Sequence, residues 1–259
     1  VLLISISLIP GCATHQLQTD IEKTPVHAYP PAKSGPIQEI TQKLNSAADP
    51  DYSEFMLLPD SLESLHWRIL LSDLAEKSID VQYYIFDNDD SSRIFGLALI
   101  RAANRGVRVR LLVDDIFLMN RGNNIALWNE HPYIEIRVFN PWHKRGSLFQ
   151  KALEFIGYSE RLNQRMHNKL FAVDNHIAII GGRNIGDAYF GLSHAYNFLD
   201  LDVIAAGPIV NKVSDSFDLY WNDDWTVSAS ALARPGNDPL SQEKIVQDDM
   251  EILKKSDKV

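Results

Sequence analysis

The sequence predicts an α/β protein in which a mixed, largely parallel sheet is flanked by helices. Three observations predict this class. Between residues 60 and 140, segments with helical spacing of apolar residues alternate with segments of strand composition. The connections between these segments are short. The resulting order, strand–helix–strand–helix–strand, is typical of parallel strands whose crossover helices cover the sheet.

The first helix is predicted over residues 60–77, because Asp60 and Glu63 form an N-terminal capping pair ahead of an apolar face. A strand is expected over residues 81–86. Apolar residues at helical spacing then predict a second helix, which ends at Gly106.

Two further strands are predicted from alternation of apolar and polar residues. The first covers residues 107–113, and the second covers residues 134–138 before the break at Asn140 and Pro141. A short helix is plausible between them, over residues 124–130. These elements complete the alternating part of the chain.

A hairpin is predicted further along the chain. Residues 168–173 have strand composition, Asp174 and Asn175 form a turn pair, and residues 176–180 are a second apolar strand. The sequence after Pro208 predicts one more helix, with its apolar residues facing the core.

Polar groups suited to phosphate chemistry surround this hairpin. His167 and Lys169 are two residues apart, so on an extended backbone both side chains project to one face, ~7 Å apart. A phosphodiester needs a nucleophile for phosphorus and fixed positive charge for its oxygens, and this pair supplies both. Asn184 adds an amide donor, while Gly181 and Gly182 allow the backbone to approach an anion closely.

The pattern of these residues resembles the HKD signature of the phospholipase D superfamily, with six positions at the family's intervals: His167, Lys169, Asp174, Gly181, Gly182 and Asn184. The resemblance covers roughly residues 52–225 and includes the segments VQYYIFDND and GGRNIGDAYF. Within the superfamily, the chain looks like the bacterial cardiolipin synthases of the C type and their lipoprotein relatives. Gly182 departs from the pattern, since many members carry a serine there.

The resemblance implies the phospholipase D-like fold and a mechanism. His167 is expected to attack phosphorus and form a phosphohistidine, while Lys169 and Asn184 stabilise the added negative charge. A second histidine would protonate the leaving alkoxide, and an alcohol or water would then release the product. No metal or other cofactor is expected.

Acidic residues complete the expected site. The resemblance implies an acid on a later strand that orients the nucleophilic imidazole, and Asp200 occupies that place, with Asp202 as the reserve candidate. Asp174 is grouped with the catalytic residues by its place in the motif. A turn aspartate after a strand usually bonds the neighbouring backbone, which favours a structural role for it.

The expected function is that of a phosphatidyltransferase or phospholipase acting on phospholipid phosphodiesters, similar to a cardiolipin synthase. Phospholipase D sites are built from two HKD copies, and the residues after Trp225 contain no second His-x-Lys. The partner lobe is therefore expected from a missing C-terminal half or from a homodimer mate. The alternatives are a homodimeric single-motif phosphodiesterase or nuclease, and a non-catalytic envelope scaffold.

The N-terminus indicates export. An apolar run over residues 1–9 precedes Gly11 and Cys12, which resembles the end of a bacterial lipoprotein signal with Cys12 as the acylated residue. A plain thiol is the alternative.

The expected divisions are a signal-like segment over 1–12, a proline-containing polar tether over 13–51, a catalytic lobe over 52–225, and a polar tail or linker over 226–259. The expected location is the bacterial cell envelope, with the lipoprotein anchored in a membrane and facing the periplasm.

Charge narrows the expected partners. The net charge of −9 argues against a general nucleic-acid coat protein. Between His143 and Arg183, however, seven basic residues accompany three acidic ones. This local excess suits an anionic substrate at a membrane surface, although a solvated helix face explains it equally well.

Overall fold

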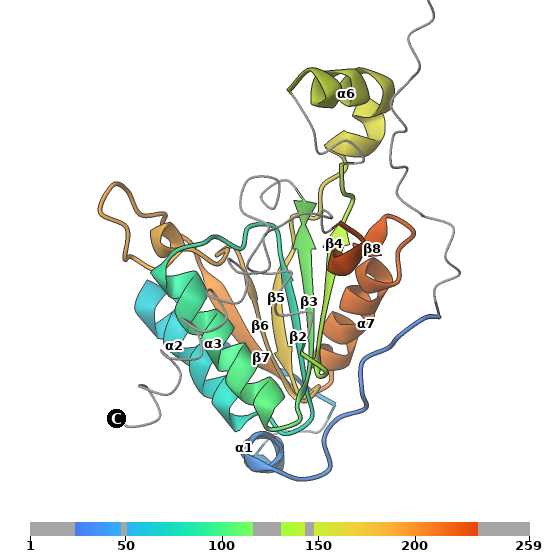
Figure 1. The fold of residues 1–259 in the computed structure, drawn as a ribbon. Helices are drawn as coiled ribbons and strands as arrows, with labels where there is room; N and C mark the ends of the chain where they lie inside the picture. Colours follow the sequence, from blue (N-terminus) through green and yellow to red (C-terminus); the bar gives the residue numbers. More distant parts are fainter. Residues whose placement is uncertain (1–23, 48–50, 116–130, 143–147, 233–259) are drawn as a thin grey trace, which may run out of the picture.

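The computed structural model describes residues 24–47, 51–115, 131–142 and 148–232. In this part of the chain, one eight-stranded sheet has the strand order β1-β7-β6-β5-β2-β3-β4-β8. Figure 1 shows helices on both faces of the sheet. The strands are β1 (Glu54–Leu58), β2 (Ser78–Tyr83), β3 (Arg108–Asp114), β4 (Ile134–Phe139), β5 (Lys169–Val173), β6 (Ile177–Gly181), β7 (Asp202–Ala206) and β8 (Thr226–Ser228).

The helices are α1 (Pro36–Ala47), α2 (Ser61–Leu74), α3 (Asp90–Asn104), α6 (Leu148–Asn163) and α7 (Ile209–Trp221), and two short 3₁₀ turns are η1 (Asp187–Tyr189) and η2 (Ala229–Leu232). Helices α2 and α3 cover one face of the sheet and α7 covers the other (Figure 1). Helix α6 stands beyond the end of the sheet at which β2 and β3 finish (Figure 1).

The α/β class is confirmed, but the expectation of a largely parallel sheet is wrong. Only the β2–β3 and β3–β4 pairings are parallel among the seven that the described residues form. The β5–β6 hairpin reverses the chain direction beside β2, and β7 and β1 continue the antiparallel half. Alternating helices and strands predict parallel neighbours only where a helix crosses between them, as α3 does between β2 and β3.

Most of the predicted elements are present. Helix α2 begins after Asp60, whose Oδ1 accepts a hydrogen bond from the Glu63 backbone nitrogen at 2.8 Å. Strand β2 begins at Ser78, three residues before the predicted start. The turn pair Asp174 and Asn175 has φ values of 52° and 54°, the left-handed conformation that is common in tight hairpin turns. The predicted helix over 124–130 lies outside the described residues.

Two hydrophobic cores follow from the two-residue period of the strands. In β2, Ile79, Val81 and Tyr83 face the core beneath α2 and α3, whereas Asp80 and Gln82 face the side of α7. On that second side, Arg110 bridges the carboxylates of Asp80 and Asp218 at 2.7 and 2.9 Å and stacks over aromatic rings of α7. The buried cation thus ties the sheet to α7.

The expected polar tether over 13–51 is corrected for residues 24–47, which pack on the domain. The backbone nitrogens of Val26 and Ala28 donate to Asn222 and Asp218 of α7 at 2.9 and 2.8 Å. Prolines remove backbone donors, so this extended strap is fixed by side chains of the domain. The short helix expected after Pro36 is present as α1, and its Ile37 is fully buried.

The expected polar tail also begins later than predicted. Residues 226–228 form the edge strand β8, which pairs with β4, and η2 follows over residues 229–232. A three-residue strand gives too little periodicity to be recognised from sequence. Within the described ranges, no helix is both long and apolar enough to cross a membrane.

Candidate active site

His167 lies two residues before the start of β5, at the end of the sheet where β2 and β3 finish. Its segment is anchored from β3, because Asp114 accepts a hydrogen bond from the Met166 backbone nitrogen at 3.0 Å. Asp114 also pairs with Arg165 at 3.2 Å, and Arg165 donates to the Asn140 carbonyl at 2.9 Å. The backbone around the imidazole is therefore fixed by buried polar contacts.

The imidazole and the ammonium of the HKD motif are in direct contact. Lys169 Nζ lies 3.1 Å from His167 Nδ1 and donates to the His167 carbonyl at 2.7 Å. The ring of Tyr84 packs against both groups, with its centroid 4.8 Å from the His167 ring and 5.5 Å from Lys169 Nζ. Because Nδ1 is engaged, Nε2 is the imidazole nitrogen left for a substrate.

Burial tunes both groups. Burial, followed by the nearby Lys169 charge, lowers the pKa of His167 below its usual 6.5, so the imidazole is neutral at pH 7. Burial lowers the pKa of Lys169 to about 8, against an opposing effect of the Asp200 carboxylate. A neutral imidazole can act as a nucleophile, and the lysine retains most of its charge at neutral pH.

The glycine pair lies close to the start of β7. A Cβ on Gly181 would lie 2.5 Å from the Leu201 carbonyl and 2.7 Å from Asp202 Cα, so the backbones could not approach as they do. A Cβ on Gly182 would overlap the Asp200 carboxylate. The second glycine, where many superfamily members carry serine, thus leaves room for that carboxylate.

Asn184 is buried, and its Oδ1 accepts a hydrogen bond from the Ile85 backbone nitrogen at 3.0 Å. With the oxygen held in this way, the amide nitrogen is the end suited to a phosphate oxygen. Asn184 therefore joins the segment after β6 to the segment after β2.

Asp200 and Asp202 have different surroundings. Asp200 is partly exposed, accepts from its neighbour's backbone nitrogen at 2.8 Å, and lies near enough to Lys169 to act on its charge. Asp202 is fully buried, with Ser64 Oγ at 2.6 Å, Arg68 Nη2 at 3.0 Å and Arg183 Nη1 at 3.5 Å. The reserve candidate is therefore part of a structural ion network.

Asp174, which was grouped with the catalytic residues, lies at the other end of β5 from His167. At ~3.4 Å per residue, this places it about 17 Å from Lys169 along the strand. Its carboxylate accepts hydrogen bonds from three consecutive backbone nitrogens at 2.7–3.0 Å, those of Glu76, Lys77 and Ser78. The catalytic grouping is corrected, because these contacts fix the start of β2 and the hairpin turn.

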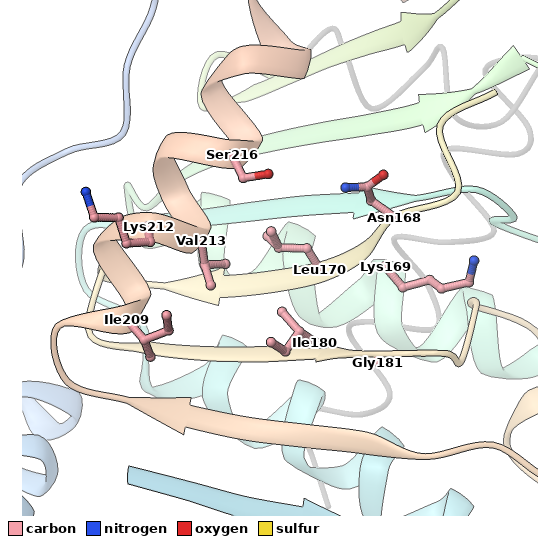
Figure 2. Close-up of a pocket in the computed structure, with 9 residues that line it drawn as sticks. All are labelled: Asn168, Lys169, Leu170, Ile180, Gly181, Ile209, Lys212, Val213 and Ser216. Atoms are coloured by element: carbon pink, nitrogen blue, oxygen red, sulfur yellow. The ribbon is translucent and has the colours of Figure 1, made fainter. Parts of the chain in front are cut away.

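A pocket of about 390 Å³ runs beside the site between α7 and the β5–β6 hairpin. Figure 2 shows Lys169 at one end, with its ammonium pointing beyond Gly181, and Lys212 at the other end. The lining is mixed: Leu170, Ile180, Ile209 and Val213 are apolar, and Asn168 and Ser216 join the two lysines as polar residues. The part of the chain that the structure describes contains no cluster of three His, Cys, Asp or Glu that could hold a metal ion.

Sequence reasoning missed two residues of this arrangement. Tyr84 follows a buried strand, and core packing is the default explanation for an aromatic residue there. Asp114 ends a strand, where carboxylates are commonly turn formers. Both residues could have been assigned to the site from their positions at strand ends, since the carboxyl ends of parallel β2 and β3 meet at one edge of the sheet.

The fold and the site together define a protein of the phospholipase D class, with a single HKD motif at the end of a mixed sheet. The family model described as cardiolipin synthase, phospholipase D-like domain, matches residues 70–221. The chain belongs to that family.

Curated relatives agree with this assignment. An uncharacterized protein of Helicobacter pylori strain 26695 is 40% identical over 230 residues, which are 88% of this chain and 45% of that protein. Cardiolipin synthase C of Escherichia coli K12 is 48% identical over 164 residues, 63% of this chain and 34% of that protein. The chain thus spans less than half the length of these relatives.

Solved structures show the same fold. NucT from Helicobacter pylori has a TM-score of 0.50 at 15% identity, covering 68% of this chain and 98% of that one. Phosphatidylserine synthase from Haemophilus influenzae has a TM-score of 0.53 at 16% identity, covering 83% of this chain and 46% of that one.

Proposed function

We propose that the chain is one lobe of a phosphatidyltransferase or phospholipase that acts on phospholipid phosphodiesters, in the manner of a cardiolipin synthase. The observation that carries the proposal is the contact between His167 and Lys169, 3.1 Å apart beside the glycine pair. The 48% identity to cardiolipin synthase C of Escherichia coli supports a lipid substrate over a nucleic acid. The net charge of −9 supports the same choice.

The reaction begins at the imidazole. His167 Nε2 attacks phosphorus, the bond from phosphorus to the leaving oxygen breaks, and a phosphohistidine forms. The attack needs the ring proton on Nδ1, so Lys169 must turn its ammonium from that nitrogen toward a phosphate oxygen. Asp200 is the proposed acceptor that then holds the imidazole N–H.

Charge stabilisation follows from the same side chains. The Lys169 ammonium and the Asn184 amide lie on either side of the glycine pair in sequence and stabilise the charge that grows on the phosphate oxygens. The second half-reaction reverses the first. An alcohol attacks phosphorus to complete a transfer, or water attacks to complete a hydrolysis, and His167 is released.

A second HKD lobe is the proposed partner of this one. The leaving alkoxide must gain a proton, and the described residues place no second histidine beside His167 as its general acid. The chain covers 45% of the Helicobacter pylori relative, which leaves room there for a second lobe of this size. The proposed location is the bacterial envelope with Cys12 acylated, and Cys12 lies outside the described residues.

The test is a parallel assay of lipid and DNA turnover. Protein containing this chain and its second lobe is incubated with phosphatidylglycerol vesicles and with DNA, and the His167→Ala variant is the matched control. We expect new phospholipid products, intact DNA and loss of turnover in the variant. DNA cleavage without any change in phospholipids would establish the nuclease alternative, and an active His167→Ala variant would refute the nucleophile.

A further inference from the structure

Five large apolar side chains lie exposed within one short stretch, residues 191–201, which we name the apical loop. They are Leu192, Tyr196, Phe198, Leu199 and Leu201. Leu199 is fully exposed and Tyr196 is 62% exposed. An ordered concentration of apolar surface of this kind commonly marks an interaction site.

The loop is built to hold these side chains outward. The Asn197 side chain accepts from the Ser193 backbone nitrogen and donates back to the Ser193 carbonyl, each at 3.1 Å. Phe198 donates its backbone N–H to the Ala188 carbonyl at 2.8 Å. Its ring lies between those of Tyr189 and Tyr196, with centroids 4.8 and 5.3 Å away. The exposure of Leu199 therefore belongs to a braced loop tip.

The apical loop is joined directly to the phosphate site. Leu201 accepts a hydrogen bond from the Gly182 backbone nitrogen at 3.1 Å, and Asp200 lies against Gly182. Figure 1 shows this orange loop projecting away from the sheet at the end where β2 and β3 finish. Whatever the tip contacts, the contact lies beside the reacting phosphate.

We propose that the apical loop inserts its tip into the interface of a phospholipid bilayer. The shape supports a bilayer over a protein groove, because a narrow projecting tip offers little area for a complementary protein surface. The composition supports it as well, since tyrosine, phenylalanine and leucine without any lysine or arginine suit the boundary between headgroups and acyl chains. The partner is thus a lipid surface recognised by apolar insertion.

Insertion of the tip sets how deep the active site lies in the bilayer. This step rests on the proposed function, in which the substrate is a phospholipid. With Leu199 among the acyl chains, Asp200 and Gly182 come to the level of the headgroup phosphates. A phospholipid could then present its phosphodiester to His167 with its acyl chains still in the membrane. The apical loop is in this view an interfacial anchor for the site.

The sequence allows a direct test, because Cys12 is the single cysteine of the chain. In protein that contains this chain and its second lobe, Cys12→Ser and the replacement of any cysteine beyond these 259 residues by serine leave Leu199→Cys to carry an environment-sensitive fluorophore. Vesicles of phosphatidylglycerol and phosphatidylcholine contain lipids with quenchers at a shallow or a deep position. The matched control is Leu219→Cys, since Leu219 is a leucine of α7 that is 75% exposed. Quenching depends on the depth of the labelled residue itself. Membrane binding through the apolar N-terminal run therefore does not produce the signal expected for insertion of the apical loop.

We expect a blue shift and shallow-quencher quenching for the label at 199, and neither for the label at 219. In a chain labelled through Tyr196→Cys, Leu199→Asp should remove most of the quenching. Equal signals at 199 and 219, or a spectral change at 199 caused by self-association without vesicles, would overturn the proposal. The His167→Ala variant separates the two hypotheses, because insertion should persist in it although turnover is lost.

Discussion

Asp114 and Met166 are joined by a hydrogen bond of 3.0 Å, from the Met166 backbone nitrogen to the carboxylate of Asp114, one residue before His167. The same carboxylate pairs with Arg165. The end of β3, a strand of the parallel half of the sheet, thereby fixes the residues that lead into the β5–β6 hairpin.

The first prediction concerns this anchor. Asp114→Ala leaves the Arg165 guanidinium, whose side chain is only 11% exposed, without its buried partner. We expect the free energy of unfolding to fall by about 3 kcal/mol, measured by urea denaturation. The exposed pair of Arg101 and Asp73 provides the control, and Asp73→Ala should cost less than about 1 kcal/mol. Equal effects of the two variants would contradict a buried anchor.

The second prediction is that the motif lysine reduces stability. Burial lowers the pKa of Lys169 to about 8, so its charged form is disfavoured in the folded chain. Lys169→Met should abolish turnover yet raise the free energy of unfolding at pH 7 by roughly 1–3 kcal/mol. Lys212→Met is the control, because Lys212 is largely exposed. A lower free energy of unfolding for Lys169→Met than for the unsubstituted protein would contradict the prediction.

The sign of the pH dependence follows from the same pKa. Between about pH 8 and 10.5 the unfolded chain keeps a proton that the folded chain has lost at Lys169, so the contribution of this residue to stability rises with pH. The advantage of Lys169→Met should therefore be largest below pH 8 and shrink toward pH 10.5. Denaturation curves at several pH values measure this trend.

The third prediction concerns the imidazole. Burial and the Lys169 charge both lower the pKa of His167. Lys169→Met should raise that pKa toward 6.5 without restoring it fully, because the burial remains. NMR titration checks this outcome, with the His167 resonance assigned by comparison with His167→Gln. A lower pKa in the variant would show that the lysine does not act through its charge.

The fourth prediction compares the two glycines. Gly181→Ala places a methyl group against the backbone of Leu201 and Asp202, which cannot move easily, and should cost about 3 kcal/mol or more. Gly182→Ser displaces only the Asp200 carboxylate, which can rotate, and should cost about 1 kcal/mol. Thermal unfolding of both variants gives the order, and the reverse order would refute the close approach at Gly181.

The fifth prediction separates structural from catalytic acids. Asp174→Ala leaves three backbone N–H groups at the start of β2 without their acceptor and should cost about 3 kcal/mol or more. Because Asp174 lies at the far end of β5, the NMR-measured pKa of His167 should stay unchanged. Asp215→Ala, at an exposed position of α7, is the control for stability. A change in the pKa of His167 in the Asp174→Ala variant would show that Asp174 acts on the catalytic site.

Local patterns predicted most of the fold. The cap at Asp60, the turn at Asp174 and Asn175, and the two-residue period of the strands were each visible in the sequence and are present. The antiparallel half was missed because strand direction depends on which strands become neighbours, and β1 has its partner in β7 about 150 residues later. No local pattern encodes that pairing.

The site was predictable where the motif is contiguous. His167, Lys169 and the glycine pair come from one hairpin and its flanks, so their spacing was enough to bring them together. Tyr84 and Asp114 reach the same place from other strands, and tertiary packing alone reveals them. The surroundings of Asp202 were hidden for the same reason, since its partners come from α2 and from the residues after β6.

The pairing of β1 with β7 also determines when β1 can join the sheet during synthesis of the chain. Glu54 leaves the ribosome long before Ala206, the residue opposite it in the sheet. Until β7 emerges, Phe55 and Leu57 have no neighbouring strand, and closing so long a loop is slow. The nascent chain therefore exposes the unpaired backbone edge of β1 until β7 has been made, and the side chains of Phe55 and Leu57 stay exposed in the finished fold as well.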